Sequence, residues 1–184
     1  MVVTLGIAAC ATSRAPLPGR EPPAEPVLAP SVHEPLPGEE LSVLDLDGDG
    51  VPDTWTYSIA GQDGARAVVR RERDLDGDGR TDAREDLVAG RVSVRTLDLD
   101  GDGRPDLVLR YDARGELTVK EYAFGADGRP RVRAFHEGGV LVRRERDRDG
   151  DGKPDAWESW VGGELDEVSA AGEPTRRRPA PAQK

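Results

Sequence analysis

Four short runs of the chain place an aspartate at nearly every second position. Residues 45–53 read DLDGDGVPD, and similar runs are DLDGDGRTD at 74–82, DLDGDGRPD at 98–106 and DRDGDGKPD at 147–155. Clustered carboxylates repel one another, and this repulsion raises their pKa values unless a cation lies between them. Ca²⁺ takes about six to eight oxygen ligands, which carboxylates on a tightly curled loop can supply. The runs therefore predict sites for a hard divalent cation.

The order of residues within each run assigns a role to each position. In the first run Asp45, Asp47 and Asp49 hold the first, third and fifth positions, and Asp53 the ninth. The glycine in the sixth position allows a sharp turn, which usually needs a positive φ. The residue in the seventh position, Val51, is expected to offer its backbone carbonyl. The same positions in the other runs give the expected ligands Asp74, Asp76, Asp78, Arg80 (carbonyl) and Asp82; Asp98, Asp100, Asp102, Arg104 (carbonyl) and Asp106; Asp147, Asp149, Asp151, Lys153 (carbonyl) and Asp155.

The runs resemble the DxDxDG calcium loops of EF-hands, dockerins, thrombospondin type 3 repeats and integrin-type FG-GAP domains. The resemblance covers these runs alone, and it implies bound Ca²⁺. An EF-hand also has a bidentate Glu in the twelfth position, a role that the resemblance assigns to Glu85 and Glu158. The first and third runs have Thr56 and Leu109 there, so weaker binding, or an acid borrowed from a neighbouring repeat, is expected. Mg²⁺ is less expected because it keeps its waters and rarely fills an all-protein cage.

The eighth position departs from the EF-hand pattern. It holds Pro52, Pro105 and Pro154, with Thr81 in the second run, where an EF-hand has an aliphatic residue that pairs two loops. Proline donates no hydrogen bond, so paired EF-hands are not expected. Dockerin loops lead into helices, and a four-stranded FG-GAP blade needs a longer repeat. A metal-free alternative, Asp/Gly turns closed by side-chain hydrogen bonds, remains open, although such turns need one Asp rather than four.

The spacing of the runs indicates a repeat of about 24 residues. Their first residues are separated by 29, 24 and 49 positions, and the last interval suggests a fifth copy at 123–131, AFGADGRPR. This copy keeps Asp127 and the glycine after it. Ala123, Gly125 and Arg131 replace its first, third and last acids.

Segments between the runs alternate apolar and polar residues with a period of two. Trp55, Tyr57 and Ile59 alternate with Thr56 and Ser58, and similar patterns at 92–95, 107–111 and 140–143 are broken by glycine-containing turns. Such patterns are typical of β-hairpins. A helix is compatible only with 81–88. The predicted fold class is therefore all-β: repeated antiparallel β-hairpins joined by calcium-binding loops along one edge of an elongated sheet.

Composition and charge restrict the class of protein. The 184 residues are 36% hydrophobic and 4% aromatic, which is a thin core for this length. Such a chain either stays partly disordered or takes another source of stability, such as bound metal ions. The net charge of −10 argues against a nucleic-acid partner, which would need a basic surface.

The start of the chain, MVVTLGIAAC, is an uncharged apolar run that ends in a single cysteine, Cys10. It resembles a bacterial lipobox, which implies lipidation of Cys10 and a lipid anchor in the membrane. A short apolar strand with a buried thiol is the alternative. We expect a signal segment at 1–10, a Pro-rich disordered tether at 11–40, the calcium-loop β-repeat module at 41–169 and a disordered tail at 170–184. By analogy with enterobacterial sorting, Ala11 after the cysteine favours the outer membrane over the inner.

No pattern of catalytic residues is apparent, so an enzyme is not expected. His33 and His136 lie far apart in the sequence, without the spacing of a zinc site or a catalytic dyad. Trp55, Trp157 and Trp160 fit either a core or a sugar-binding face. The sequence thus predicts a calcium-binding cell-envelope lipoprotein with a structural or binding role. The alternative is a carbohydrate- or protein-recognition module, dockerin-like in use, of a secreted or surface system.

Overall fold

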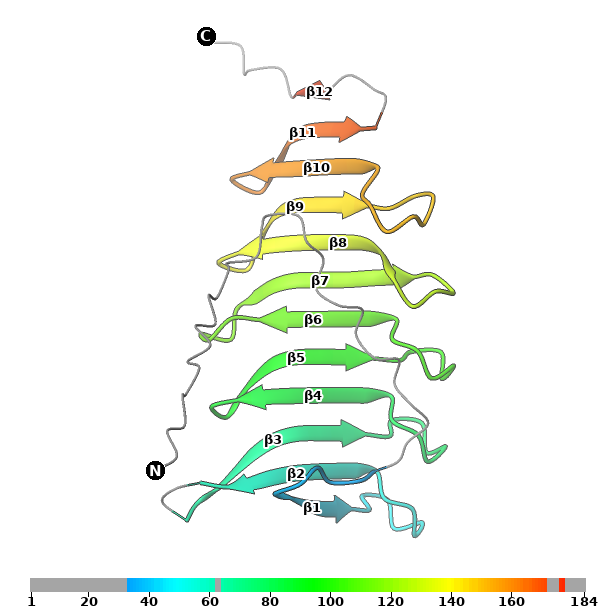
Figure 1. Ribbon diagram of the computed structural model, residues 1–184, viewed down its shortest axis with the longest axis vertical. Helices are drawn as coiled ribbons and strands as arrows, with labels where there is room; N and C mark the ends of the chain where they lie inside the picture. Colours follow the sequence, from blue (N-terminus) through cyan, green and yellow to red (C-terminus); the bar gives the residue numbers. More distant parts are fainter. Residues whose placement is uncertain (1–32, 62–63, 172–175, 178–184) are drawn as a thin grey trace, which may run out of the picture.

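The computed structural model describes residues 33–61, 64–171 and 176–177. In these residues the fold is one open antiparallel sheet whose twelve strands follow one another in chain order (Figure 1). The strands are β1 Glu39–Leu44, β2 Thr54–Ala60, β3 Arg66–Arg73, β4 Ala83–Val88, β5 Arg91–Leu97, β6 Leu107–Tyr111, β7 Leu117–Phe124, β8 Pro130–Glu137, β9 Val140–Arg146, β10 Ala156–Val161, β11 Glu164–Ala170 and β12 Arg176–Arg177. The predicted all-β class of consecutive hairpins is confirmed, and the 81–88 segment contributes strand β4.

Two kinds of connection alternate along the sheet. The Asp-rich runs connect β1 to β2, β3 to β4, β5 to β6 and β9 to β10, and the 123–131 copy connects β7 to β8. We call the four Asp-rich runs the first to fourth loops, in chain order. All five connections emerge on the same side of the sheet, and tight glycine-containing turns close the opposite side (Figure 1). Because each repeat adds two strands, neighbouring loops lie about 10 Å apart.

The five hairpins closed by the tight turns each contain one shift in register. The shifts follow Tyr57, Asp86, Arg110, Phe135 and Ser159, at corresponding places in successive repeats. An extra residue in one strand increases the local right-handed twist. The sheet is therefore built from one repeated unit, twisted in the same way each time.

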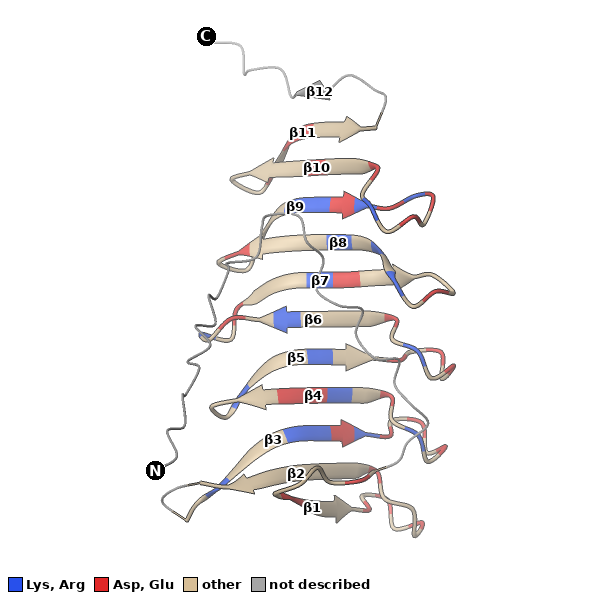
Figure 2. Ribbon diagram, in the orientation of Figure 1, with Lys and Arg blue, Asp and Glu red and all other residues tan. Residues whose placement is uncertain are grey.

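Little apolar surface is buried in this sheet. Among the described residues, the buried apolar side chains are Trp55, Tyr57, Val108 and three alanines, whereas the buried polar residues include seven carboxylates of strands and loops. Basic and acidic residues occur together on strands β3, β4, β7 and β9 (Figure 2). Glu121 of β7, for example, accepts hydrogen bonds from Arg110 of β6 at 3.2 Å and Arg133 of β8 at 2.9 Å. Ion pairs between neighbouring strands thus stabilise this part of the sheet, where few apolar side chains are buried.

Strands and contacts lie on both sides of residues 41 and 169, the limits expected for the module. Strand β1 begins at Glu39, and His33 stacks on Trp55 with ring centroids 3.5 Å apart. The folded part therefore begins before residue 41. At the other end, the expected tail contributes β12, which pairs with β11. The expected signal segment, Cys10 and the tether up to residue 32 lie outside the described residues.

Candidate metal centres

The first aspartate of each loop organises the turn around its carboxylate. In the second loop, Asp74 accepts hydrogen bonds from the backbone N–H groups of Asp76, Gly77 and Gly79 at 3.2, 2.7 and 2.6 Å. The chain can curl so tightly because Gly77 and Gly79 have φ values of +81° and +82°. A side chain in this left-handed region would be strained. The glycine in the fourth position is thus as necessary as the glycine in the sixth, for which the sequence pattern already predicts a sharp turn.

The other three aspartates are oriented by backbone N–H groups as well. Asp76 accepts from the N–H of Asp78 at 3.1 Å, Asp78 from that of Arg80 at 2.8 Å, and Asp82 from that of Leu75 at 2.6 Å. The other loops repeat these bonds in the same register: to Asp45, Asp47, Asp49 and Asp53; to Asp98, Asp100, Asp102 and Asp106; and to Asp147, Asp149, Asp151 and Asp155. All four acids of a loop therefore have a local structural role.

Each loop also gathers three carboxylates closely enough to hold a metal ion. In every group the ligand atoms lie within 4.8 Å of one another. Two oxygens that each lie about 2.4 Å from one Ca²⁺ ion are at most about 4.8 Å apart, so the spacing suits a single ion. The groups are Asp45, Asp47 and Asp53; Asp74, Asp76 and Asp78; Asp98, Asp100 and Asp106; and Asp147, Asp149 and Asp155.

The hydrogen bonds within the loops are compatible with this role. The backbone N–H groups bonded to Asp47, Asp76, Asp100 and Asp149 all contact Oδ1. A carboxylate has two oxygens with about four lone-pair sites in all, so one backbone bond leaves capacity for an ion. A loop can therefore be closed by side-chain hydrogen bonds and still have carboxylate oxygens for a metal ion. The two interpretations of the loops do not exclude each other.

Some expected ligands lie outside these groups. The groups do not include Asp49, Asp82, Asp102 and Asp151, although all four accept the loop hydrogen bonds described above. The seventh-position residues donate their backbone N–H groups to the fifth-position aspartates. These residues are Val51, Arg80, Arg104 and Lys153. Coordination by their carbonyls remains a prediction.

The twelfth-position glutamates are strand residues paired with arginines. Glu85 of β4 is directly opposite Arg71 of β3 and Arg95 of β5, and its carboxylate contacts them at 3.1 and 2.7 Å. Glu158 of β10 likewise accepts a hydrogen bond from Arg144 of β9 at 2.6 Å. Neither residue belongs to an Asp group. Both glutamates thus lie in strands and contact arginines, and their coordination of an ion remains a prediction.

Burial distinguishes the first loop from the others. Asp45 is exposed, whereas Asp74 and Asp98 are only 6% and 4% exposed. Burial and the charges of Asp76 and Asp74 raise the pKa of Asp82 above its ordinary value. Both effects disfavour the ionised form of this carboxylate.

Arginines connect successive loops. The guanidinium of Arg80, in the seventh position of the second loop, donates to the carbonyl of Gly101 in the third loop at 3.4 Å. Arg104 of the third loop donates to the carbonyl of Ala126, in the 123–131 copy, at 3.1 Å. Both bonds join the seventh position of one copy to the fourth position of the next. The loops therefore form a connected row rather than isolated turns.

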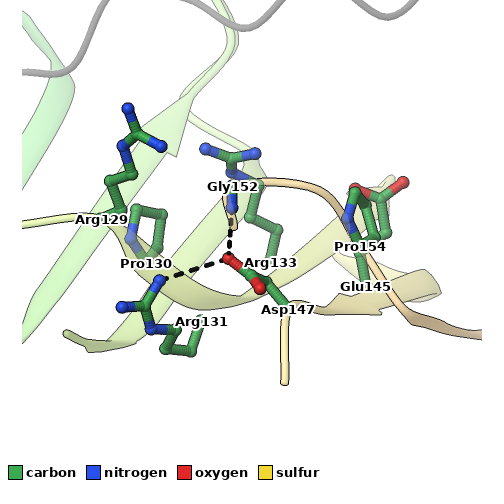
Figure 3. A pocket seen from close by; sticks show the side chains of 8 residues that line it. All are labelled: Arg129, Pro130, Arg131, Arg133, Glu145, Asp147, Gly152 and Pro154. Carbon is green, nitrogen blue, oxygen red and sulfur yellow. Dashed lines mark hydrogen bonds and ion pairs between the residues drawn. The ribbon is translucent and has the colours of Figure 1, made fainter. Parts of the chain in front are cut away.

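The 123–131 copy replaces lost acids with a cation of its own. Arg131, in its ninth position, contacts Asp127 of the same copy at 3.1 Å and Asp147 of the fourth loop at 3.2 Å. Figure 3 shows its guanidinium pointing at the Asp147 carboxylate. In the sequence alone, Arg131 stands only as the replacement for a lost acid. The reversal of charge at that position was the signal that could have identified its role.

The tryptophans and histidines form neither an aromatic platform nor a catalytic pair. Trp55 is 5% exposed beneath His33, whereas Trp157 and Trp160 are half-buried in β10 on either side of a register shift. Strands β2 and β10 lie near opposite ends of the sheet (Figure 1). His136 belongs to β8, far from His33 at β2.

Comparisons with known proteins assign no family. No protein-family model and no curated protein matches the chain. A crystal structure of an S. aureus TarM mutant, in complex with Fondaparinux, alpha-GlcNAc-glycerol and UDP, shows a likeness with a TM-score of 0.40 and 7% identity, covering 59% of this chain and 20% of that one. At this score the likeness carries no argument about function. Among the described residues, no helix has the length and apolar character to cross a membrane.

Proposed function

We propose that this protein is a calcium-binding lipoprotein of the bacterial cell envelope, in which Ca²⁺ stabilises the β-repeat module. The observation that carries the proposal is the set of four Asp groups, each with ligand atoms within 4.8 Å, aligned along one edge of a single sheet. The role proposed for the module is structural: a long, twisted spacer or binding surface whose shape depends on the ions.

The hydrophobic core of the module is small. A sheet with few buried apolar side chains gains little from the hydrophobic effect. The loops, meanwhile, concentrate acids such as Asp74 and Asp98 in buried positions. An ion that binds only the folded loops contributes its binding free energy to folding. Ca²⁺ fits this task better than Mg²⁺ because the ligands are protein oxygens in a flexible loop.

The direct test is calorimetric titration of Ca²⁺ into chelator-treated full-length protein, with circular dichroism and thermal melting before and after. We expect binding at about 10⁻⁴–10⁻³ M, as is typical of extracellular calcium modules. The melting temperature should rise with Ca²⁺ and fall again when chelator is added. Mg²⁺ at the same concentration should give a much smaller shift.

A matched pair of variants separates ion binding from general charge effects. The loop variant changes the first aspartate of every loop to asparagine, and the control neutralises the same number of acids outside the loops. The loop variant is Asp45→Asn, Asp74→Asn, Asp98→Asn and Asp147→Asn; the control is Glu40→Gln, Asp86→Asn, Glu116→Gln and Glu137→Gln. Only the loop variant should lose the calcium response. A response that is equal in both, or absent from the wild-type protein, contradicts the proposal.

Attachment to the membrane is proposed through lipidated Cys10, on the outer rather than the inner membrane. The support is the lipobox-like run before that cysteine. In bacterial cells fed a labelled fatty acid, the wild-type protein should incorporate the label, and Cys10→Ser should not. Fractionation of the envelope then tests which membrane holds the protein. A label-free wild-type protein would remove the anchor from the proposal.

A recognition module is the second candidate, and one observation favours a protein partner over a sugar. Leu46, Leu75 and Leu99, in the second position of their loops, are 68%, 64% and 68% exposed. They repeat every two strands along the loop edge, whereas the tryptophans share no such row. In this reading, changing all three leucines to serine abolishes cross-linking to envelope proteins but leaves calcium binding intact. Unchanged cross-linking would count against a protein partner at this edge.

A further inference from the structure

The fourth loop differs from the other three in what surrounds its first aspartate. Oδ2 of Asp147 accepts the N–H of Gly152 at 3.0 Å and the Arg131 guanidinium at 3.2 Å (Figure 3). A carboxylate oxygen has about two lone pairs, so both are engaged. In the second and third loops, Oδ2 of the first aspartate accepts the corresponding glycine N–H. The fourth loop thus already holds a cationic group against a carboxylate that an ion would use.

The surroundings of Arg131 are shaped to admit its side chain. A Cβ atom on Gly150 would lie 2.8 Å from Cζ of Arg131, and one on Gly125 would collide with the same guanidinium. Gly125 stands where the other copies have their third-position aspartate. Unlike Gly150, it does not have a positive φ. Its lack of a side chain is therefore explained by the room that Arg131 needs.

The electrostatics agree with the geometry. The Asp147 carboxylate accepts the N–H groups of Gly150 and Gly152 and faces the guanidinium of Arg131, so its negative charge is already opposed by a cation. Arg131 is 27% exposed and Asp147 is 8% exposed, so the pair is partly shielded from solvent. The same guanidinium contacts Asp127, so it joins the two copies as a bridging ion would.

We propose that Arg131 is a built-in cation that keeps the 123–131 copy independent of metal and makes the fourth loop the weakest calcium site. This inference rests on the proposed calcium binding of the loops. A divalent ion at the fourth loop must displace the guanidinium from Asp147 or bind with one ligand fewer. The protein would then respond to calcium in two stages, with the first three loops filling before the fourth.

Nuclear magnetic resonance of the full chain labelled with ¹⁵N-glycine tests this loop by loop. The N–H groups of Gly50, Gly79, Gly103 and Gly152 each donate to the first aspartate of their own loop, so each resonance reports one site. In a Ca²⁺ titration of the wild-type protein, the Gly152 resonance should move last. In Arg131→Gln its midpoint should fall by about tenfold, because a positive charge near the ion is removed. The other three midpoints should not change.

Two further variants control for charge and for folding. Arg129→Gln removes the same charge from the same short copy but leaves the contact with Asp147, so the Gly152 midpoint should stay at the wild-type value. Gly125→Ala keeps the charge but forces the guanidinium aside, so the midpoint should fall as in Arg131→Gln. In chelator, Arg131→Gln should melt at a lower temperature than Arg129→Gln, since the bridge between the copies is lost.

The outcomes are distinguishable. If all four resonances respond to Ca²⁺ but the Gly152 midpoint is the same in the wild-type protein and Arg131→Gln, the role of Arg131 is refuted while calcium binding stands. If none of the four responds at about 1 mM Ca²⁺, the typical upper range of extracellular modules, calcium binding and this inference fail together. A Gly152 midpoint that falls equally in Arg129→Gln would also overturn the inference, because net charge rather than position would be responsible.

Discussion

The backbone N–H of Asp74 donates to the backbone carbonyl of Asp53 at 3.0 Å, joining the first residue of the second loop to the last residue of the first. The N–H of Asp98 makes the same bond to Asp82 at 2.8 Å. Each loop is therefore hydrogen-bonded to its neighbour at the position where a ligand begins or ends. We expect a change in the curl of one loop to affect the next through this bond, so that the first three loops respond as a connected row.

Removal of the first aspartate should cost more in the second loop than in the first. Asp74 is 6% exposed and accepts three backbone N–H groups, whereas the exposed Asp45 accepts two. Bonds to a charged acceptor contribute about 1.5–3 kcal/mol each, less where water competes. We expect Asp74→Ala to lower the free energy of unfolding by about 3 kcal/mol and Asp45→Ala by about 1 kcal/mol. Urea denaturation in chelator measures both, and equal costs would contradict the assigned role of burial.

Neutralising Asp82 should have opposite effects with and without calcium. In chelator at pH 7, Asp82→Asn should raise the melting temperature, because the ionised carboxylate is disfavoured by burial and by the nearby charges of Asp76 and Asp74. The asparagine oxygen can still accept the Leu75 N–H. In saturating Ca²⁺ the same change should lower the melting temperature, because an acid beside the ion is lost. Differential scanning calorimetry under both conditions checks the reversal.

The pH dependence has a definite sign. A raised pKa in the folded state means that the folded protein binds more protons than the unfolded chain just above the ordinary value of 3.8. Asp82 should therefore add stability to the metal-free protein as the pH falls into that range, and Asp82→Asn should remove this gain. Asp112, whose pKa is lowered by the N–H of Glu116, is the control. Asp112→Asn should destabilise the protein both with and without calcium.

Sequence patterns were sufficient to predict the fold because each strand of the sheet pairs with strands next to it in the chain. Alternation such as Trp55–Thr56–Tyr57, with a glycine turn every dozen residues or so, leaves each strand to pair with the next in the chain, and it does so. The loop positions followed from the same periodicity. The pattern did not reveal two contacts between separate segments: the Arg131 bridge to Asp147, and the position of His33 on Trp55. Those contacts join residues too far apart in sequence for a local pattern to indicate.

At the twelfth position, the family resemblance and the contacts in the structure suggest different roles for the same residue. The EF-hand pattern assigns Glu85 to the ion, but in this structure Glu85 lies between Arg71 and Arg95. We expect Glu85→Gln to lower the free energy of unfolding by about 1–2 kcal/mol. The loss is limited because both arginines are partly exposed, so water can solvate their guanidinium groups. The Ca²⁺ midpoint of the Gly79 resonance should be unchanged.

Glu121→Gln is the matched control for this experiment, since Glu121 is paired with Arg110 and Arg133 in the same manner. The two variants should lose similar stability. A fall in calcium affinity of about tenfold or more in Glu85→Gln alone would show instead that Glu85 leaves its arginines to become a ligand.

The contact between His33 and Trp55 places the start of the folded module before residue 41. Their rings stack with an interplanar angle of 5°, and Nδ1 of His33 lies 3.0 Å from Oε2 of Glu72, which also accepts the Tyr57 hydroxyl at 3.0 Å. Stacking and a hydrogen bond to a buried acid are worth about 1–3 kcal/mol together. We expect His33→Ala to lose this stability and to shift tryptophan fluorescence to longer wavelength as Trp55 is exposed.

His136→Ala is the control, since that histidine lies in β8, away from Trp55 and the segment before β1. It should leave the fluorescence maximum unchanged. A chain shortened to begin at Leu41 should melt lower than His33→Ala, because it also loses Glu39, whose carboxylate contacts Arg70 at 3.0 Å over the same patch. If the shortened chain melts at the same temperature as the full-length protein, the segment before β1 does not stabilise the sheet. The boundary at residue 41 would then be the right one, because the contacts of His33 and Glu39 would contribute nothing to folding.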